Sequence, residues 1–358
     1  MLINNMNVFI IIKCGFQDSF FFISQIANVK RIKKVIVFRD SKTLSNPMVE
    51  YVVPKIFINS ILKNVIRLMQ IVRRKHLQPK AIVGIYEIPH GLLAVIAGKI
   101  LKVPSIVSII GNPAFTKLRQ GYRMKLTMWI MKNANYITVT GNNSKRFIAS
   151  KGIPVDKIFI LPNSIDFNSF KHNHNTKKIY DIISLGRISQ EKHIEIIVEV
   201  IDKLSKKNPN ITAAIAGSGP ELENIKNLIK EFNLEQNITI LGFIPDESLE
   251  KFFNSGRIFV LPSETEGFPR TIIQAASCGI PVVSTDVGDI SDIITDGEDG
   301  FLIDGFDNVD IFSNKINQLL SDEFLRNKFS SKLKTKVQLK LSHEKASDVW
   351  NKILGGYN

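Results

Sequence analysis

The stretch SETEGFPRTIIQAASCGIPVVSTDVG, residues 263–288, decides the predicted fold of this 358-residue chain. Its pattern predicts a loop, a helix and a buried strand, with a Glu-Gly pair at the mouth of the helix. A second stretch, GRISQEK at 186–192, follows the predicted strand IYDIISLG. Ligands of doubly wound parallel sheets bind outside the carboxyl ends of the strands. We therefore expect both stretches at one binding edge.

Short β-branched runs alternate with helical patterns along the whole chain. The predicted strands of the first half lie at 7–11, 34–38, 81–86, 105–110, 135–140 and 157–161. Helical periodicity covers 60–76 and 91–102, and NPNITAAIAG, ITIL, IFVL and PVVST continue the alternation in the second half. The pattern predicts parallel sheets covered by helices on both faces, twice over. We therefore predict an α/β protein with two Rossmann-like domains.

The domain boundary is expected in FNSFKHNHNTKK, a polar stretch at 167–178 with little apolar content. It divides the chain into a first domain, 1–170, and a second domain, 171–358, which are both of ordinary domain size. The last helical stretch, from about 322 to 354, is a candidate to pack back on the first domain.

The composition, with 44% apolar and 22% charged residues, is that of a globular protein. Cys14 and Cys278 lie far apart in apolar settings, which favours free buried thiols in a reducing compartment over a disulfide. The apolar runs at 8–11 and 20–23 are too short for a signal peptide or a membrane span. We expect a cytoplasmic protein.

The charge is divided unevenly between the two halves. Residues 1–170 hold 25 Lys and Arg against 6 Asp and Glu, a net charge of +19, and the remainder holds 22 against 27, a net charge of −5. This asymmetry predicts an anionic partner for the first half, either nucleic acid or an acidic membrane surface. A merely soluble basic domain is the alternative.

Arg187 and Lys192 place two cations at the end of a predicted strand. Such a pair suits a diphosphate, because it neutralises the charge that grows on a leaving group. The Gly-rich turn AGSGPE at 216–221 and the loop LGFIP at 241–245 are further candidate ligand loops at this edge.

The loop at 263–271 allows two interpretations. Ser263 and Glu266 fit a capping box, which is a purely structural role. Gly267 permits close approach of a ligand, and Pro269 fits the first helical turn, where its missing N–H would be unpaired in any case. The second interpretation is therefore a shaped entry to a binding site.

The start of this predicted helix suits a ligand with two kinds of groups. The N–H groups of Arg270 and Thr271 would point at an anion. Glu266 would repel phosphate and is a natural partner for hydroxyls, and Gln274, about two turns on, lies on the same face. A nucleotide sugar, anionic at one end and rich in hydroxyls at the other, meets these requirements.

At this point the second half resembles the donor domain of the family-4 retaining glycosyltransferases (glycosyltransferase group 1), which have the GT-B fold. The motifs that carry the resemblance are GR…K, AGSGPE, LGFIP, EGFP…QAASCGIPVVSTDVG and GEDGFLI, joined in the first half by ILPNSIDFNSF and PHGLLAVIAGKILKVPSIVSIIG. They span about 81–320. The resemblance implies two Rossmann-like domains whose parallel sheets face a central cleft.

The resemblance also implies roles for individual residues. Arg187, Lys192 and Glu266 would act in catalysis by stabilising the departing nucleoside diphosphate and holding the transferred sugar. The other implied donor-binding residues are Gly186, Gly217, Gly219, Gly242, Phe243, Ile244, Gly267, Phe268, Pro269, Arg270, Thr271 and Gln274. Gln274 replaces the second glutamate of the family's usual pair, which keeps hydrogen bonding but loses the charge.

Two departures lie on the acceptor side. The usual Gly-Gly loop near the N-terminus is reduced to Gly15, and Ile110 stands where the family has a histidine. His90, at a predicted strand-to-helix turn, is a candidate to polarise an acceptor hydroxyl, with a structural role as the alternative. The chain contains no Asp-x-Asp metal clamp, so we expect no metal ion and no cofactor besides a UDP- or GDP-sugar co-substrate.

The segment RQGYRMKLTMWIMK at 119–132 combines cations with a Met and Trp stripe. As a helix it would lie at an anionic membrane interface, with burial of the stripe in the core as the alternative. No nucleic-acid recognition motif accompanies the charge, so we expect no nucleic-acid partner. The predicted function is hexose transfer from a nucleotide sugar to a lipid-linked or cell-surface glycan, at the inner face of the cell membrane. A catalytically silent nucleotide-sugar sensor or partner subunit is the alternative.

Overall fold

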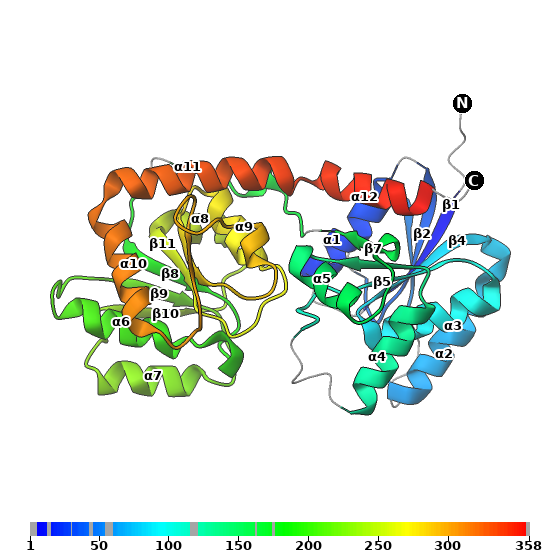
Figure 1. The fold of residues 1–358 in the computed structure, drawn as a ribbon, viewed down its shortest axis with the longest axis horizontal. Helices are drawn as coiled ribbons and strands as arrows, with labels where there is room; N and C mark the ends of the chain where they lie inside the picture. The colour runs from blue at the N-terminus through cyan, green and yellow to red at the C-terminus, as the bar shows by residue number, and fades with distance from the viewer. Residues whose placement is uncertain are drawn as a thin grey trace. The chain divides into compact units, whose positions relative to one another are not determined.

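The computed structural model describes residues 6–12, 16–29, 31–42, 46–53, 60–114, 121–161, 163–173 and 176–355. The chain forms two compact units: unit 1 comprises residues 1–163 and 343–358, and unit 2 comprises residues 164–342. The boundary lies a few residues before the predicted one. The final helix lies within the predicted second domain but was a candidate to pack back on the first, and it belongs to unit 1 (Figure 1).

Unit 1 contains a seven-stranded parallel sheet in the order β3-β2-β1-β4-β5-β6-β7. Its strands are β1 (Met6–Ile11), β2 (Ile32–Phe38), β3 (Val49–Val52), β4 (Pro79–Ile85), β5 (Ser105–Ser108), β6 (Tyr136–Val139) and β7 (Ile158–Ile160). Its helices are α1 (Phe16–Ala27), α2 (Ser60–Arg73), α3 (Leu92–Leu101), α4 (Tyr122–Asn133), α5 (Asn142–Ser150) and α12 (His343–Gly355). None of the described helices of the chain is both long and apolar enough to cross a membrane.

Helix α12 completes one face of the unit 1 core. Trp350 is fully buried and packs in the same cluster as Ile23 and Ile26 of α1 and Val8 of β1. Its indole Nε1 donates a hydrogen bond to the side-chain oxygen of Gln25 at 3.4 Å. The chain therefore returns to unit 1 after unit 2 is complete, and the last helix is part of the first domain's core.

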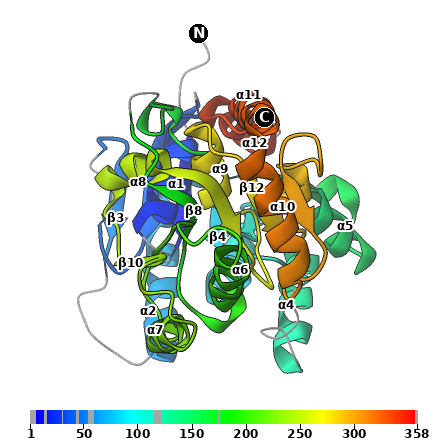
Figure 2. The same cartoon turned by 90° about the vertical axis from the view of Figure 1, so that its left-hand side faces the viewer.

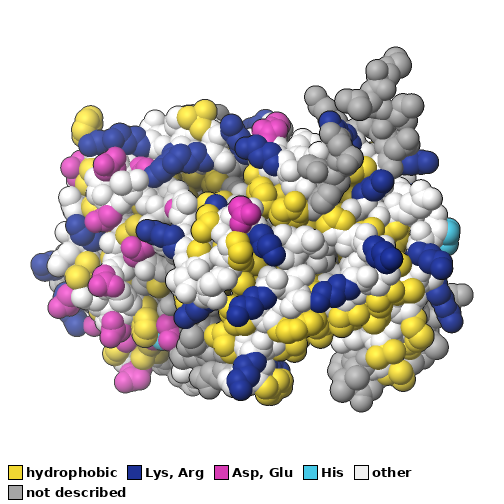
Figure 3. All heavy atoms as spheres, turned by 45° about the vertical axis from the view of Figure 1, so that its right-hand side comes forward, with side chains coloured by type: hydrophobic (Ala, Val, Ile, Leu, Met, Phe, Trp, Pro, Cys, Tyr) yellow, Lys and Arg dark blue, Asp and Glu magenta, His cyan; other side chains and the backbone are white. Residues whose placement is uncertain are grey.

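Unit 1 carries most of the positive charge. It holds 27 Lys and Arg against 7 Asp and Glu, a net charge of +20, whereas unit 2 holds 20 against 26, a net charge of −6. Figure 3 shows a face on which dark blue Lys and Arg side chains lie among yellow hydrophobic ones. The charge asymmetry of the sequence is thus an asymmetry between folded units.

Unit 2 contains a six-stranded parallel sheet in the order β10-β9-β8-β11-β12-β13. Its strands are β8 (Tyr180–Leu185), β9 (Ala213–Ala216), β10 (Ile238–Gly242), β11 (Gly256–Leu261), β12 (Val282–Thr285) and β13 (Phe301–Ile303). Its helices are α6 (Glu195–Ser205), α7 (Leu222–Glu231), α8 (Leu249–Ser255), α9 (Arg270–Ser277), α10 (Val309–Ser321) and α11 (Glu323–Lys340). Helices α6, α7 and α10 are seen around the strands in Figure 2.

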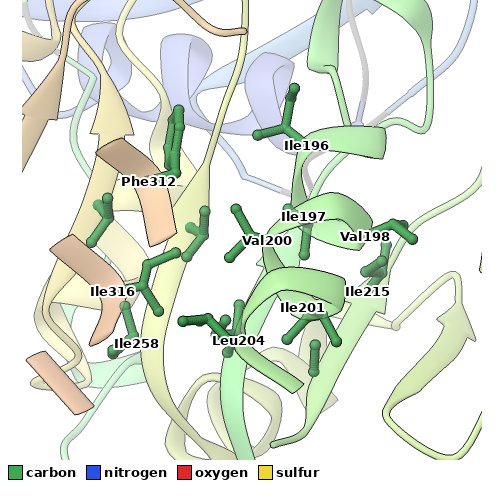
Figure 4. Packing of buried hydrophobic residues seen from close by; sticks show 14 of the residues in the cluster. Ile196, Ile197, Val198, Val200, Ile201, Leu204, Ile215, Ile258, Phe312 and Ile316 are labelled. Atoms are coloured by element: carbon green, nitrogen blue, oxygen red, sulfur yellow. The ribbon is translucent and has the colours of Figure 1, made fainter. Parts of the chain in front are cut away.

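Helices cover both faces of the unit 2 sheet because its strands are apolar on both sides. On β8, Ile182 points into one core cluster and Ile183 into the other. The first cluster contains the inner faces of α6 and α10, including Ile197 and Phe312, as Figure 4 shows. The second contains α8, α9 and part of α11. The prediction of two parallel-sheet Rossmann-like domains is confirmed.

The cysteine prediction is confirmed for Cys278, which is a free and buried thiol at the end of α9. Burial raises the pKa of this thiol to about 12. Cys14 and Gly15 lie outside the described residues. Because its pKa is raised, the buried Cys278 thiol is neutral and unreactive at ordinary pH.

Candidate donor site

The strand order of unit 2 places the two decisive stretches side by side. Strands β8 and β11 are neighbours, and the chain leaves their carboxyl ends through residues 186–192 and 262–269. This is the switch point of the sheet, because β9 and β10 lie on one side of β8 and β12 and β13 lie beyond β11. Ligands of open parallel sheets bind at such a point.

Glycines allow the first loop to lie directly against the turn that follows β9. A Cβ added to Gly217, whose φ is +136°, would lie 1.8 Å from the carbonyl oxygen of Gly186. A Cβ on Gly219 would lie 2.0 Å from the carbonyl oxygen of Ile188. The Ile188 N–H donates to the Ser218 carbonyl at 3.0 Å. The Gly-rich turn is thus a backbone clamp that fixes the loop carrying Arg187.

The second loop is held by the strands and loops on either side of it. The Glu264 N–H donates to the Glu191 carbonyl at 2.9 Å, which joins it to the first loop. The Thr285 hydroxyl donates to the Ser263 carbonyl at 2.6 Å. A Cβ on Gly288 would lie 1.9 Å from the carbonyl oxygen of Glu266. Backbone contacts therefore set the positions of both loops.

Lys192 and Glu266, 74 residues apart, form an ion pair between the two loops. The Lys192 Nζ donates to Glu266 Oε1 at 2.5 Å, and the Ser263 hydroxyl donates to the same oxygen at 2.8 Å. Both charged side chains are mostly buried. The capping-box interpretation of Ser263 and Glu266 is wrong, because the helix begins only at Arg270 and the two side chains bond to each other.

Arg187 supplies the exposed cation of the site. Its side chain is exposed, and among the described residues it forms no ion pair. Burial raises the pKa of Glu191, but the hydrogen bond from Ser189 and the charges of Lys192 and Arg187 outweigh burial, so this pKa lies below its usual value. Glu191 therefore stays ionised next to the cations.

Helix α9 points its N-terminus at the same edge. It starts at Arg270 after the N-cap residue Pro269, and the first N–H groups of a helix have no partner within the helix. The Phe268 side chain is buried in the unit 2 core, where it packs among apolar residues. Gln274 lies on the second turn, and its side chain is almost fully buried. Thr271 is partly exposed.

The end of β10 and the loop after it lie on the other side of the Gly-rich turn at 216–221. The Gly217 N–H donates to the carbonyl of Gly242 at 2.7 Å, and Gly242 has a φ of +68°. Phe243 follows with 75% of its side chain exposed. Ile244 packs partly against the core. A large exposed aromatic ring at a binding edge has no core role, so it is available for a ligand.

Sequence reasoning missed His193, which follows Lys192 in a left-handed conformation with a φ of +47°. Its ring stacks on Phe306, with centroids 3.8 Å apart and planes at 13°. Its Nδ1 lies 2.7 Å from Glu195 Oε1, and its Nε2 lies 3.9 Å from Glu264 Oε2. The adjacency of His193 to Lys192 was visible in the sequence, but the contact with Phe306 was not.

His90 lies in unit 1, at the turn that connects β4 to α3. It is buried, and its Nδ1 lies 2.8 Å from the Ile85 carbonyl oxygen. Since a carbonyl only accepts, Nδ1 carries the hydrogen and a neutral ring has its lone pair on Nε2. This tautomer suits proton transfer through Nε2. Ile110 is a partly buried member of the core cluster that contains β1.

The family comparison covers nearly all of unit 2. Residues 164–336 match the family model described as glycosyl transferases group 1. Unit 2 belongs to this family. The matched residues include the loops that carry Arg187, Lys192 and Glu266.

Two relatives illustrate the similarity in sequence. The chain is 29% identical over 231 residues to the poly(ribitol-phosphate) alpha-N-acetylglucosaminyltransferase of Staphylococcus aureus, covering 63% of this chain and 45% of that protein. It is 35% identical over 123 residues to the 2-deoxystreptamine N-acetyl-D-glucosaminyltransferase of Niallia circulans, covering 34% of this chain and 32% of that one. The matches thus span less than half the length of either relative.

Solved structures show the same fold over nearly the whole chain. The crystal structure of Anabaena HepE in complex with UDP matches with a TM-score of 0.82 and 16% identity, covering 98% of this chain and all of that one. The crystal structure of TarM, a protein of S. aureus, matches with a TM-score of 0.69 and 21% identity, over 80% of this chain and 58% of that one. The chain therefore has the GT-B fold.

Proposed function

We propose that the protein is a retaining glycosyltransferase that moves a hexose-type sugar from a nucleotide sugar to a glycan acceptor. The observation that carries the proposal is the ion pair between Lys192 and Glu266. It lies at the switch point of the unit 2 sheet, in the loops that also carry the exposed Arg187. A cation and a carboxylate fixed at 2.5 Å provide one group for a diphosphate and one for sugar hydroxyls.

Arg187 and Lys192 stabilise the departing nucleoside diphosphate in this proposal. Negative charge develops on the leaving group as the glycosidic bond breaks, and cations already in place lower the free energy of that state. Backbone contacts fix the loop that carries both residues, and the ion pair with Glu266 fixes the Lys192 side chain. Glu266 and the N–H groups after Gly267 hold the sugar and the diphosphate.

Phe243 and Gln274 complete the donor site in the proposal. The exposed ring of Phe243, with Gly242 and Ile244, lines the base, and the Gln274 amide bonds to the ribose hydroxyls. UDP-sugars are the first donors to test, because HepE was solved with UDP and with UDP-glucose. The N-acetylglucosamine named for both relatives is the first sugar to test after glucose.

On the acceptor side, we assign His90 Nε2 to polarise the attacking hydroxyl. The Nδ1 hydrogen bond to Ile85 fixes the tautomer that this role requires. The acceptor is a lipid-linked or cell-surface glycan, in keeping with the net charge of +20 on unit 1, and the protein works peripherally on the inner face of the cell membrane.

The test is a panel of radiolabelled UDP- and GDP-sugars offered with membrane extracts to the wild-type protein and to Arg187→Gln. We expect transfer or donor hydrolysis from one donor, with a rate reduced by about 100-fold or more in the variant. Lys203→Gln is the matched control, because Lys203 is an exposed cation of the same unit that pairs with Asp310. A panel without any turnover would contradict the proposal.

A second candidate function follows from Gln274, which stands where the resembled family has glutamate. A nucleotide-sugar sensor or partner subunit would bind donor without turning it over. Thermal shifts measured with UDP-, GDP- and ADP-sugars separate the two functions. A donor-induced shift that Arg187→Gln abolishes, together with no turnover in the wild-type protein, favours the sensor.

A further inference from the structure

Three neighbouring helices of unit 1 expose large apolar side chains to solvent. Each of these side chains is more than 40% exposed. They are Leu62, Val65 and Met69 of α2, Ile100 of α3, and Tyr122 and Trp129 of α4. We call this set, with the cations of the same helices, the α2–α4 surface. Scattered single exposed residues need no explanation, but a group on adjacent elements marks an interaction site.

The three helices of the α2–α4 surface are in contact with one another. The inner face of α2 packs on α3, with Ile71 and Ala97 in one core cluster. The Lys99 Nζ of α3 lies 5.1 Å from the centroid of the Trp129 ring of α4 and donates to Asn133 Oδ1 at 2.5 Å. The apolar residues of α2 recur at i, i+3 and i+7, which places them on one outward stripe. Figure 1 shows the three helices on the same part of unit 1.

The charges on the three helices themselves have one sign, and the nearby Asp40 carboxylate pairs with Lys63 and Arg67 of α2. Helices α2, α3 and α4 contain no Asp or Glu. Residues 51–155 hold 17 Lys and Arg and a single acidic residue, Glu87, which is buried. Exposed cations flank the apolar stripe, among them Arg73 on α2 and Arg123 and Lys125 on α4. A surface that is apolar and predominantly basic is complementary to an anionic, partly apolar partner.

We propose that the α2–α4 surface docks unit 1 on a bilayer that contains anionic phospholipids. The apolar side chains enter the boundary between headgroups and acyl chains, and the surrounding Lys and Arg contact the headgroups. This deepens and rests on the proposed function, because it names the surface at which a lipid-linked acceptor is reached. Donor binding by unit 2 does not depend on it.

The structure also changes the element that was expected to contact the membrane. Sequence reasoning placed the amphipathic contact on 119–132, of which residues 119 and 120 lie outside the described residues. On α4, Ile130 and Met131 are buried in the core, whereas Trp129 is exposed. Part of the predicted stripe therefore belongs to the core and part is available for a membrane contact. The longest exposed apolar row belongs to α2, whose apolar face sequence reasoning did not assign to a membrane contact.

The test is flotation of the full chain with vesicles of phosphatidylcholine containing about 30% phosphatidylglycerol, at about 0.1 M salt. Arg123→Gln/Lys125→Gln should weaken partitioning by about 30-fold, since each cation near an anionic surface contributes about fivefold. Leu62→Ser/Val65→Ser/Met69→Ser should weaken it by about tenfold or more. Binding to pure phosphatidylcholine vesicles should be weak in every case.

Matched control variants carry the same changes on unit 2. Leu339→Ser removes a side chain as exposed as those of α2, and Lys230→Gln/Lys251→Gln removes two exposed cations. Neither should alter flotation. The docking proposal is overturned if the α2–α4 variants float like the wild-type protein, or if the controls lose binding equally. It is also overturned if the wild-type protein binds a short RNA or DNA oligonucleotide through these residues and does not bind the anionic vesicles.

A donor-induced thermal shift on the same preparations keeps the two proposals apart. Vesicle binding without any donor shift would contradict the proposed function and leave docking intact. A donor shift without vesicle binding would contradict docking alone. Each variant should keep the wild-type donor shift, which also reports that it is folded.

Discussion

Replacing Gly219 with alanine would push apart the two loops that build the donor site. The added Cβ would lie 2.0 Å from the Ile188 carbonyl oxygen, about 1.4 Å short of the 3.4 Å at which ordinary contact begins. Ile188 cannot retreat easily, because its side chain is buried in the unit 2 core and its carbonyl accepts the Glu221 N–H at 3.1 Å. The strain must therefore move the 186–192 loop or the 217–221 turn.

Arg187 immediately precedes Ile188, so the displacement reaches the proposed catalytic cation. A misplacement of about 1 Å at a reacting centre costs about 100-fold in rate. We expect kcat/KM for the donor to fall by about that factor in Gly219→Ala. Overpacking should also lower stability by about 1–3 kcal/mol, which is several degrees in Tm for a unit of this size. Rates are therefore to be measured well below the Tm of the variant.

Gly297→Ala is the control for the assay. Gly297 has a φ of +71° and nothing within 4 Å of an added Cβ, so the variant introduces backbone strain without a collision near the site. It should lose stability by about 1–2 kcal/mol and keep its kcat/KM. The clamp argument fails if Gly219→Ala stays within about threefold of the wild-type rate, or if Gly297→Ala loses activity to the same extent.

Four further expectations concern other parts of the chain. Phe243→Ala should weaken donor binding by about 2- to 10-fold without changing the Tm. Phe268→Ala, at a buried position, should destabilise unit 2 by about 3–5 kcal/mol in urea unfolding. Equal effects of the two variants on the Tm would contradict the assignment of Phe243 to the ligand and Phe268 to the core. Cys278 should resist maleimide at about pH 8 until the protein unfolds, because a pKa of about 12 keeps the buried thiol protonated, and peptide mass spectrometry of the labelled native protein checks this. Trp350→Ala should destabilise unit 1 by about 3–5 kcal/mol, while the exposed Trp129→Ala should cost less than about 1 kcal/mol, both measured by denaturant unfolding. Raising NaCl from about 0.05 to about 0.3 M should reduce vesicle flotation by about tenfold and donor affinity by less than about threefold, and a reversed order would argue against the division of roles between the units.

The β-branched runs predicted most of both sheets, because a buried parallel strand reads as a continuous apolar segment. Three elements of unit 1 were not predicted, among them helix α5, NNSKRFIAS, which is short and mostly polar. Strand β3, VEYV, has only four residues and carries Glu50, which pairs with Lys34 of β2. Helix α1 contains the run FFFI, whose lack of polar spacing hides the helical period. A short edge strand, a short polar helix and a helix with a block of adjacent apolar residues therefore escaped the pattern.

The donor-site residues were predicted as a set by their motifs and by the rule that ligands bind at carboxyl ends of strands. The contacts between them were not. Lys192 and Glu266 meet across 74 residues because β8 and β11 are neighbours in the sheet. His193 meets Phe306, from a loop beyond β13, where α6 and α10, the helices after those loops, pack in one core cluster. Local periodicity carries no information on strand order, so the ion pair and the ring stack required the folded sheet.

Both proposed binding surfaces bind anionic ligands, although the units that carry them have net charges of opposite sign. Unit 2 has a net charge of −6, so its overall field does not gather anions, and selection of a diphosphate must rest on Arg187, Lys192 and oriented backbone N–H groups at one edge. That requirement explains why the loops are clamped by glycine contacts, since fixed groups compensate for an unfavourable background. Unit 1 has a net charge of +20 and needs no such precision, because a field spread over three helices attracts an anionic surface whatever the arrangement of its headgroups.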